Sequence, residues 1–89
     1  MAVDETEVLL VRSGDDLYAV ARRCTHQGAP LDRGTIDLGG SLKTVICPAH
    51  GSRFELTTGR VLRPPASSPL ATFEARIEGG MVELRPRES

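Results

Sequence analysis

The sequence predicts a small all-β domain, a sandwich or barrel of short antiparallel strands. Three observations point to this fold class. Short apolar runs, rich in β-branched residues, are separated by turn residues at close intervals. No window of useful length repeats its apolar residues with the helical period of about 3.6 residues. The chain has 89 residues and no internal repeat or low-complexity segment, so we expect a single domain over 1–89.

The expected strands are runs of alternating or apolar residues that lie between turn signals. In chain order they cover residues 7–12, 17–21, 42–46, 52–56, 60–62, 73–78 and 81–85. Glycine and proline interrupt the segment 24–34, which is therefore expected to be a loop. Three prolines between residues 64 and 69 favour an extended loop with few backbone donors.

The first two and the last two strands are predicted to form hairpins. The first hairpin turns at residues 13–16, a cluster of small and acidic residues. The last turns at residues 79–80, a pair of glycines that favours a two-residue turn. Strict alternation before these glycines places Phe73, Ala75 and Ile77 on one face of the strand.

Charge and hydropathy disfavour several classes of function. The net charge is −1, whereas a general nucleic-acid binder carries a basic excess. No apolar run has the length of a membrane span, and residues 1–7 are acidic and lack the features of a secretory signal. We therefore expect a cytoplasmic protein, in which two cysteines indicate metal or redox chemistry before a disulfide.

Every cysteine and histidine of the chain lies in one of two short motifs. The first is Cys24-Thr25-His26, and the second is Cys47-Pro48-Ala49-His50. Taken singly, a buried cysteine is most often a small hydrophobic residue and a histidine an ordinary polar group. The paired arrangement makes that interpretation improbable. A Cys24–Cys47 disulfide would leave both histidines unexplained and fits a reducing compartment poorly.

Two kinds of metal site remain open for these four side chains. Two cysteines and two histidines can hold a tetrahedral zinc ion. Each motif, however, supplies one cysteine and one histidine, whereas zinc fingers commonly pair like with like. The arrangement favours a binuclear centre in which each loop gives one ligand to each metal. Such a centre, with bridging sulfides, is a [2Fe–2S] cluster with mixed ligands.

The residues around the motifs carry a family resemblance. Residues 24–31 (CTHQGAPL) and 47–56 (CPAHGSRFEL), followed by a Thr-Gly turn at 58–59 and Arg-Pro-Pro-Ala at 63–66, resemble the Rieske iron–sulfur domain of the soluble ferredoxin type. The resemblance covers about residues 7–85. It implies that Cys24, His26, Cys47 and His50 bind a Rieske-type [2Fe–2S] cluster. The residues that it places around the cluster are Gln27, Gly28, Gly51, Ser52, Pro64 and Pro65.

The resemblance also implies the arrangement of the domain. A cluster-binding part of about 22–65, with two ligand loops, is expected to be inserted in a basal β domain made of about 7–21 and 66–85. Some family members join their ligand loops by a disulfide, but the corresponding positions here are Ala29 and Ala49. Those members also have a tyrosine where this chain has Phe54. Ser52 is retained, but the tyrosine hydroxyl is absent, so the resemblance implies a cluster in the lower part of the Rieske range of reduction potentials.

The function implied is electron transfer and not catalysis. The chain is expected to carry one electron from a flavin-dependent reductase to an oxygenase or another redox acceptor, through exposed edges of His26 and His50. No catalytic residues are expected, and the short N-terminal segment favours a module fused to another domain. Arginines near the loops are expected mostly to be solvated (Arg22, Arg23, Arg33, Arg53, Arg60 and Arg63). The alternatives are a zinc-binding structural module with the same ligands, or an iron–sulfur redox sensor.

Overall fold

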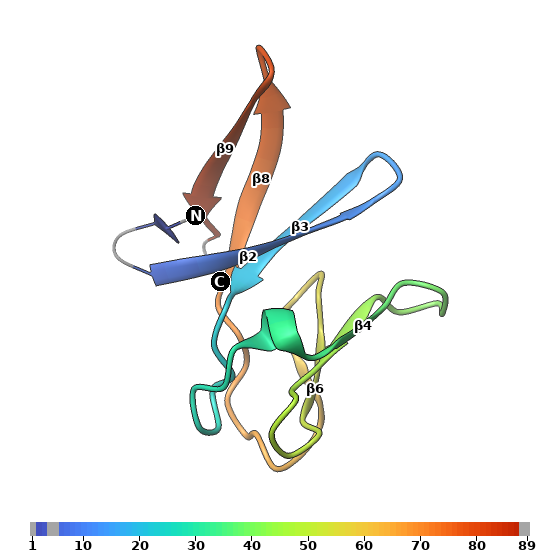
Figure 1. Ribbon diagram of the computed structural model, residues 1–89. Coiled ribbons are helices and arrows are strands. Elements are labelled where there is room, and N and C mark those ends of the chain that lie inside the picture. The colour runs from blue at the N-terminus through green and yellow to red at the C-terminus, as the bar shows by residue number, and fades with distance from the viewer. Residues whose placement is uncertain (1, 4–5, 88–89) are drawn as a thin grey trace.

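The computed structural model describes residues 2–3 and 6–87 and shows two antiparallel sheets (Figure 1). The larger sheet has the order β1-β2-β3-β8-β9, formed by β1 (Ala2–Val3), β2 (Thr6–Ser13), β3 (Asp16–Ala21), β8 (Thr72–Glu78) and β9 (Met81–Pro86). The smaller sheet has the order β4-β5-β6-β7, formed by β4 (Thr35–Asp37), β5 (Thr44–Ile46), β6 (Arg53–Glu55) and β7 (Val61–Arg63). The all-β fold predicted from the sequence is confirmed.

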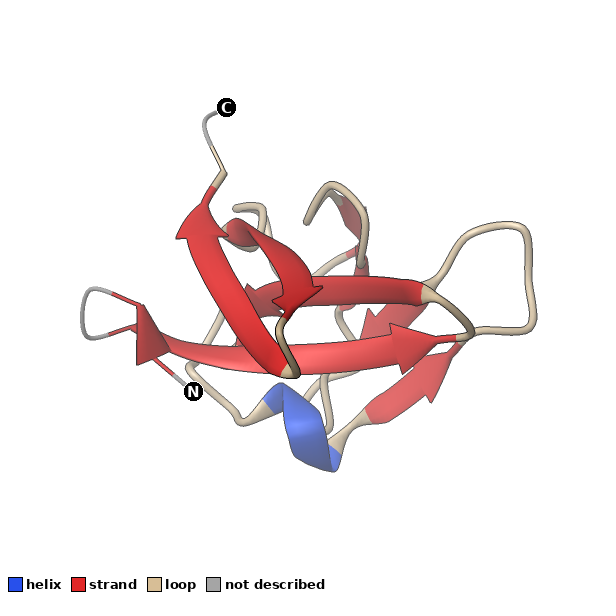
Figure 2. Ribbon diagram, turned by 90° about the horizontal axis from the view of Figure 1, so that it is seen from above, coloured by secondary structure: helices blue, strands red, loops and turns tan. Residues whose placement is uncertain are grey.

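The chain leaves the larger sheet after β3 and returns to it at β8. Everything between these strands belongs to the smaller sheet and its loops, including one turn of 3-10 helix, η1 (Leu31–Arg33). Figure 2 shows this turn in blue beside the strands. None of the residues that the structure describes forms a helix long and apolar enough to cross a membrane.

A shared hydrophobic core joins the two sheets. Val11 and Val20 of the larger sheet pack in one cluster with Val45 and Phe54 of the smaller sheet and with Leu31 of η1. Cys24 and Cys47 belong to the same cluster. The two cysteines are therefore part of the core between the sheets, and the position of each ligand loop depends on the packing of both sheets. A second cluster of buried residues lies within the larger sheet (Val8, Ala19 and Phe73).

The predicted hairpins are present with the expected turns. β2 pairs with β3 up to Ser13 and Asp16, and β8 pairs with β9 up to Glu78 and Met81. Gly79 and Gly80 have φ values of 59° and 81°, the left-handed conformation that a two-residue turn of this kind requires at both positions.

The strand β1 lies outside every predicted strand, and three further features differ from the expectations. The predicted loop 24–34 contains η1, because the fully buried Leu31 anchors this stretch in the core. The short strand β4 was not predicted, because all three of its residues are exposed. Its extended conformation is held by hydrogen bonds to β5. Ile77 lies on the predicted face but is 55% exposed, because the tip of the β8–β9 hairpin extends beyond the packed core (Figure 1).

The core position of Phe54 generates a prediction on stability. Its side chain is 0% exposed, so Phe54→Ala leaves a cavity in the core that joins the two sheets. We expect a loss of about 3–5 kcal/mol in the free energy of unfolding, measured by chemical denaturation. The control is Ile77→Ala at the exposed hairpin tip, which we expect to change the unfolding free energy by about 0.5 kcal/mol or less. Equal losses in the two variants would contradict the assignment of the core.

Candidate metal centre

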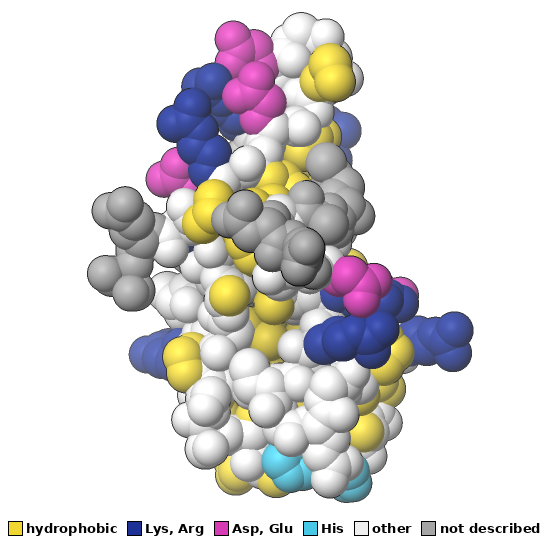
Figure 3. All heavy atoms as spheres, turned by 90° about the vertical axis from the view of Figure 1, so that its left-hand side faces the viewer, with side chains coloured by type: hydrophobic (Ala, Val, Ile, Leu, Met, Phe, Trp, Pro, Cys, Tyr) yellow, Lys and Arg dark blue, Asp and Glu magenta, His cyan; other side chains and the backbone are white. Residues whose placement is uncertain are grey.

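The four predicted ligands lie together at one end of the molecule, as a thiol pair and an imidazole pair. Cys24 and Cys47 are only 3% and 4% exposed, and the Cys47 thiol is near enough to raise the pKa of the Cys24 thiol. Both are free cysteines. His26 and His50 are exposed, with ring centroids 5.3 Å apart and planes at 85° to each other. Figure 3 shows the histidines in cyan at the lower end of the molecule.

The two ligand loops have the same backbone hydrogen-bond pattern. In the first loop, Cys24 O accepts from Gly28 N at 2.8 Å, and Cys24 N donates to Ala29 O at 2.9 Å. In the second, Cys47 O accepts from Gly51 N at 3.2 Å, and Cys47 N donates to Ser52 O at 2.7 Å. The two loops are thus equivalent turns, although the histidine follows its cysteine by two residues in one and by three in the other.

A left-handed glycine closes each of these turns. Gly28 and Gly51 have φ values of 74° and 77°, which residues with a Cβ rarely adopt. The space around both positions is open, so the backbone conformation and not crowding demands glycine. Gly28 and Gly51 therefore permit the tight turn of each ligand loop. Their shared spacing of four residues from the preceding cysteine is visible in the sequence, but only the folded chain shows that the two turns are equivalent.

The first sulfur lies against backbone amides in a buried setting. His26 N lies 3.4 Å from Cys24 Sγ, and the amide of Gln27 also faces this sulfur, whereas the Gln27 side chain is exposed. Burial raises the pKa of the Cys24 thiol, and the His26 amide opposes part of that rise. The thiol is therefore protonated at neutral pH when no metal is bound, and a metal must displace the proton in order to bind.

A third loop, residues 64–69, is hydrogen-bonded to both ligand loops. Thr25 Oγ1 donates to Ser68 O at 2.7 Å, and Ala66 N donates to Ser52 Oγ at 3.0 Å. Ser52 is fully buried, and its hydroxyl hydrogen remains free to donate to another group. The predicted Pro64 and Pro65 are exposed, so this loop meets the ligand loops through Ala66 and Ser68 while its prolines face solvent.

One residue that positions this third loop was missed in the sequence. Gly59 O accepts from Leu70 N at 2.8 Å, and a Cβ at Gly59 would lie 2.1 Å from Leu70 O. With a φ of 77°, Gly59 also has the left-handed conformation. Only glycine allows the backbones to approach so closely. The sequence marks Gly59 as a turn residue, but its contact with Leu70 depends on a pairing that only the fold creates.

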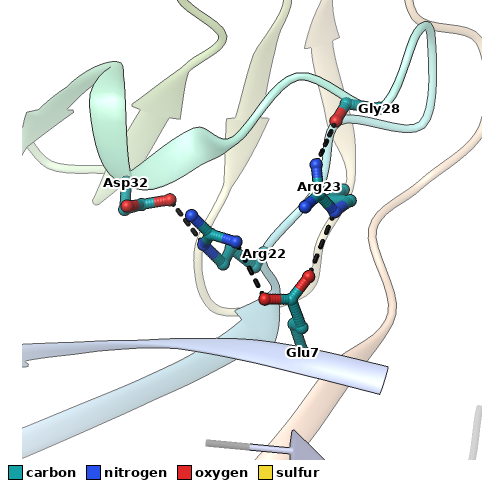
Figure 4. Close-up of polar contacts among 5 residues, drawn as sticks. All are labelled: Glu7, Arg22, Arg23, Gly28 and Asp32. Carbon is teal, nitrogen blue, oxygen red and sulfur yellow. Dashed lines mark hydrogen bonds and ion pairs between the residues drawn. The ribbon is translucent and has the colours of Figure 1, made fainter. Parts of the chain in front are cut away.

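An ion-pair network joins the first ligand loop to the larger sheet and to η1 (Figure 4). Glu7 on β2 accepts from Arg22 at 2.8 Å and from Arg23 at 3.1 Å. Arg22 also binds Asp32 of η1 at 2.8 Å, and Arg23 donates to Gly28 O at 3.1 Å. The hydrogen bond from Arg23 lowers the pKa of Glu7, and the one from Arg22 lowers the pKa of Asp32. Arg22 and Arg23 thus restrain the loop that begins at Cys24.

The candidate centre lies at one end of the molecule. Four hollows on the described surface, of about 260–590 Å³, are lined by residues other than the four candidate ligands. Among the described residues, no three His, Cys, Asp or Glu side chains gather closely enough to hold one metal ion. The donor set fits a two-iron cluster, with the thiol pair inside and the imidazole pair at the surface.

The sequence matches one domain family and several known proteins. The sequence model of the Rieske [2Fe–2S] domain matches residues 1–74. The 3-phenylpropionate/cinnamic acid dioxygenase ferredoxin subunit of Escherichia coli (strain K12) is 36% identical over 81 residues, which cover 90% of this chain and 74% of that subunit. Apoptosis-inducing factor 3 of Mus musculus is 35% identical over 79 residues, which cover 89% of this chain and 12% of that protein.

Solved structures show the same fold. The ferredoxin of carbazole 1,9a-dioxygenase from Nocardioides aromaticivorans IC177 aligns with a TM-score of 0.86 at 31% identity, covering 98% of this chain and 82% of that one. A chain from the complex of reduced oxygenase and oxidized ferredoxin in carbazole 1,9a-dioxygenase aligns with a TM-score of 0.80 at 33% identity, covering 94% of this chain and 82% of that one.

The network around Glu7 generates a pH-dependent prediction. The pKa of the Glu7 carboxyl is lowered from the usual 4.5. The ion pairs of Glu7 therefore stabilise the fold fully at pH values above 4.5. The stabilisation is lost as the pH falls through the lowered pKa. We expect Glu7→Gln to reduce the free energy of unfolding at pH 7. At a pH well below 4, the variant and the wild type should have the same free energy of unfolding. Urea denaturation across this pH range measures the difference.

A matched control is Glu74→Gln. Glu74 is exposed on β8 and forms no ion pair with any other residue in the described part of the chain. We expect this variant to follow the wild type at every pH. A Glu7→Gln effect that persists unchanged in acid would show that the loss comes from packing and not from charge.

Proposed function

The chain belongs to the Rieske [2Fe–2S] domain family, and on this basis we propose that Cys24 and Cys47 bind one iron of the cluster and His26 and His50 the other. The cofactor is a Rieske-type [2Fe–2S] cluster, which accepts or releases one electron when bound. The observation that carries the residue assignment is the pairing of buried thiols beside exposed imidazoles. The two equivalent turns closed by Gly28 and Gly51 hold these ligands.

The surrounding residues have separate roles in this proposal. The amides of His26 and Gln27 face the sulfur of Cys24. The hydroxyl of Ser52 is buried and free to donate toward the cluster. Pro64 and Pro65 are exposed on the loop that is hydrogen-bonded to both ligand loops, and this loop as a whole limits the access of water to the cluster. In this arrangement the imidazole edges of His26 and His50 are the exit for electrons.

The protein is a one-electron carrier of the kind found in dioxygenase systems. One similar structure is a complex of an oxygenase with its ferredoxin, and we extend this pairing to the present chain. Its acceptor is then an oxygenase, and its donor is a flavin-dependent reductase. The chain itself contributes no catalytic residues. We also propose a cytoplasmic setting, in which reducing conditions keep the thiols of Cys24 and Cys47 available as ligands.

The same proposal divides the chain into two parts. The cluster-binding part is about residues 22–65, and the basal part is about 7–21 and 66–85. In support, the smaller sheet is built wholly from β4 to β7, and the larger from strands on either side of them. The parts share a hydrophobic core, so we expect them to unfold as one cooperative unit. No specific observation favours the zinc-binding module or the redox sensor over the electron carrier.

Spectroscopy of ligand variants tests the assignment of the cluster. We expect protein purified without oxygen from iron-replete cells to be red-brown, with visible absorption that bleaches on reduction. Cys47→Ser and His50→Ala should lose this absorption together with iron and sulfide. Ser67→Ala, at an exposed position of the third loop, is the control and should keep all three. A colourless wild type with one zinc per chain would overturn the proposal.

The reduction potential tests the role of Ser52. Because Phe54 lacks a hydroxyl and Ser52 has one, we expect a potential in the lower part of the Rieske range, below about 0 mV. Ser52→Ala should lower the potential further, because one donor that stabilises the added electron is lost. Redox titration followed by visible absorption measures both, with Ser67→Ala as the control. A wild-type potential well above zero, or an unchanged potential in Ser52→Ala, would contradict the assignment.

A further inference from the structure

Within the described part of the chain, the loops that form the histidine-bearing end of the molecule contain no charged residues. This end is formed by the two ligand loops and the third loop that is hydrogen-bonded to them. The corresponding segments, residues 24–30, 47–52 and 64–69, contain no Asp, Glu, Lys or Arg, although 26% of the chain is charged. In Figure 3 the region around the cyan histidines is accordingly white and yellow, and the blue and magenta side chains lie further up. We call this region the neutral end.

Arginines border the neutral end at the limits of all three segments. Arg23 precedes the first ligand loop, Arg53 follows the second, and Arg63 precedes the third loop. Arg23 and its neighbour Arg22 are balanced by the carboxylates of Glu7 and Asp32 (Figure 4). On that side of the neutral end the positive charge is therefore largely compensated.

Arg53 and Arg63 have no such compensation. They are directly opposite each other in the pairing of β6 with β7, so their side chains share one face of the smaller sheet. Neither forms an ion pair with any other residue that the structure describes. Arg53 Nε is buried and lacks a hydrogen-bond partner. Two adjacent like charges with an unsatisfied donor lower stability, and an external anionic group would relieve both costs.

We propose that Arg53 and Arg63, together with the neutral end, form a docking surface for a redox protein whose uncharged hollow is bordered by carboxylates. This inference rests on the proposed function and specifies the chemistry of the partner. The neutral end approaches the partner closely because no charge has to lose its hydration there. The arginine pair fixes the orientation and speeds the encounter, since guanidinium groups bind carboxylates in a planar, two-pronged geometry.

The salt dependence of electron transfer to charged inorganic reagents tests this surface. The cluster-loaded protein is reduced and then oxidised by hexacyanoferrate(III), an anion, in a stopped-flow instrument. The whole chain has a net charge of −1, which alone would make added salt speed the reaction slightly. We expect instead that salt slows it, roughly five- to tenfold between low and high ionic strength, because the local field is positive. Tris(phenanthroline)cobalt(III), a cation, should show no such slowing.

Two double variants with the same change in net charge show whether the salt dependence comes from Arg53 and Arg63 or from the charge of the whole protein. Arg53→Gln with Arg63→Gln should lose most of the salt dependence. Arg76→Gln with Arg85→Gln, on the β8–β9 hairpin and outside the three loops, should keep it. Arg53→Lys with Arg63→Lys should retain the attraction of the anion. If the buried part of Arg53 proves necessary for folding, Arg63→Gln alone, at an exposed position, should lose about half of the effect.

A carboxylate polymer tests the chemistry of the partner directly. Poly-L-glutamate at low ionic strength should slow the oxidation of the wild type by hexacyanoferrate(III) and leave the Arg53/Arg63 glutamine variant unaffected. A wild-type rate that does not fall with salt, or equal effects of the two glutamine pairs, would overturn the docking surface. Both outcomes leave the electron-carrier function intact, because the cluster is verified by its absorption before each measurement. Absence of that absorption would instead overturn the proposed function.

Discussion

Two thiols have to lie side by side in the core while two imidazoles from the same short loops face solvent, and the rest of the structure depends on this placement. Each loop meets the requirement with one turn, in which the cysteine carbonyl accepts from the glycine four residues later. The left-handed conformation of Gly28 and Gly51 reverses the chain so that the cysteine points inward and the histidine outward. The different spacing of cysteine and histidine in the two motifs is accommodated within turns of the same form.

The turns alone do not fix the distance between the loops, which the core and the third loop set. Cys24 and Cys47 pack in the cluster of side chains that joins both sheets, so a shift of either sheet moves a ligand. Hydrogen bonds of Thr25 and Ser52 to residues 66–68 connect the loops on the outside. Glu7 adds a charged connection from the larger sheet to the start of the first loop. The fold and the candidate centre are therefore coupled through the core, the third loop and the ion pairs of Glu7.

Much of this arrangement was predictable from the sequence, and the failures have physical causes. Alternation and glycine pairs predicted both hairpins, and the spacing of Cys and His predicted the ligand pairs. The strand β4 gave no signal, because its three exposed residues are ordered only by pairing with β5. The contact of Gly59 with Leu70 and the balance of Arg22 and Arg23 by Glu7 join residues far apart in the chain. Local pattern carries no information on such partners.

An electron carrier has to expose its redox centre to a partner and still shield it from water, and the distribution of polarity here serves both needs. The sulfur side of the centre is enclosed by apolar core residues such as Leu31 and Val45. The imidazole side is bordered by uncharged residues, whose dehydration on contact costs little. Charges begin only where the loops join the strands, at a distance suited to guiding an encounter without binding the partner tightly. A surface of this kind favours complexes that form quickly and separate again, which repeated one-electron transfer requires.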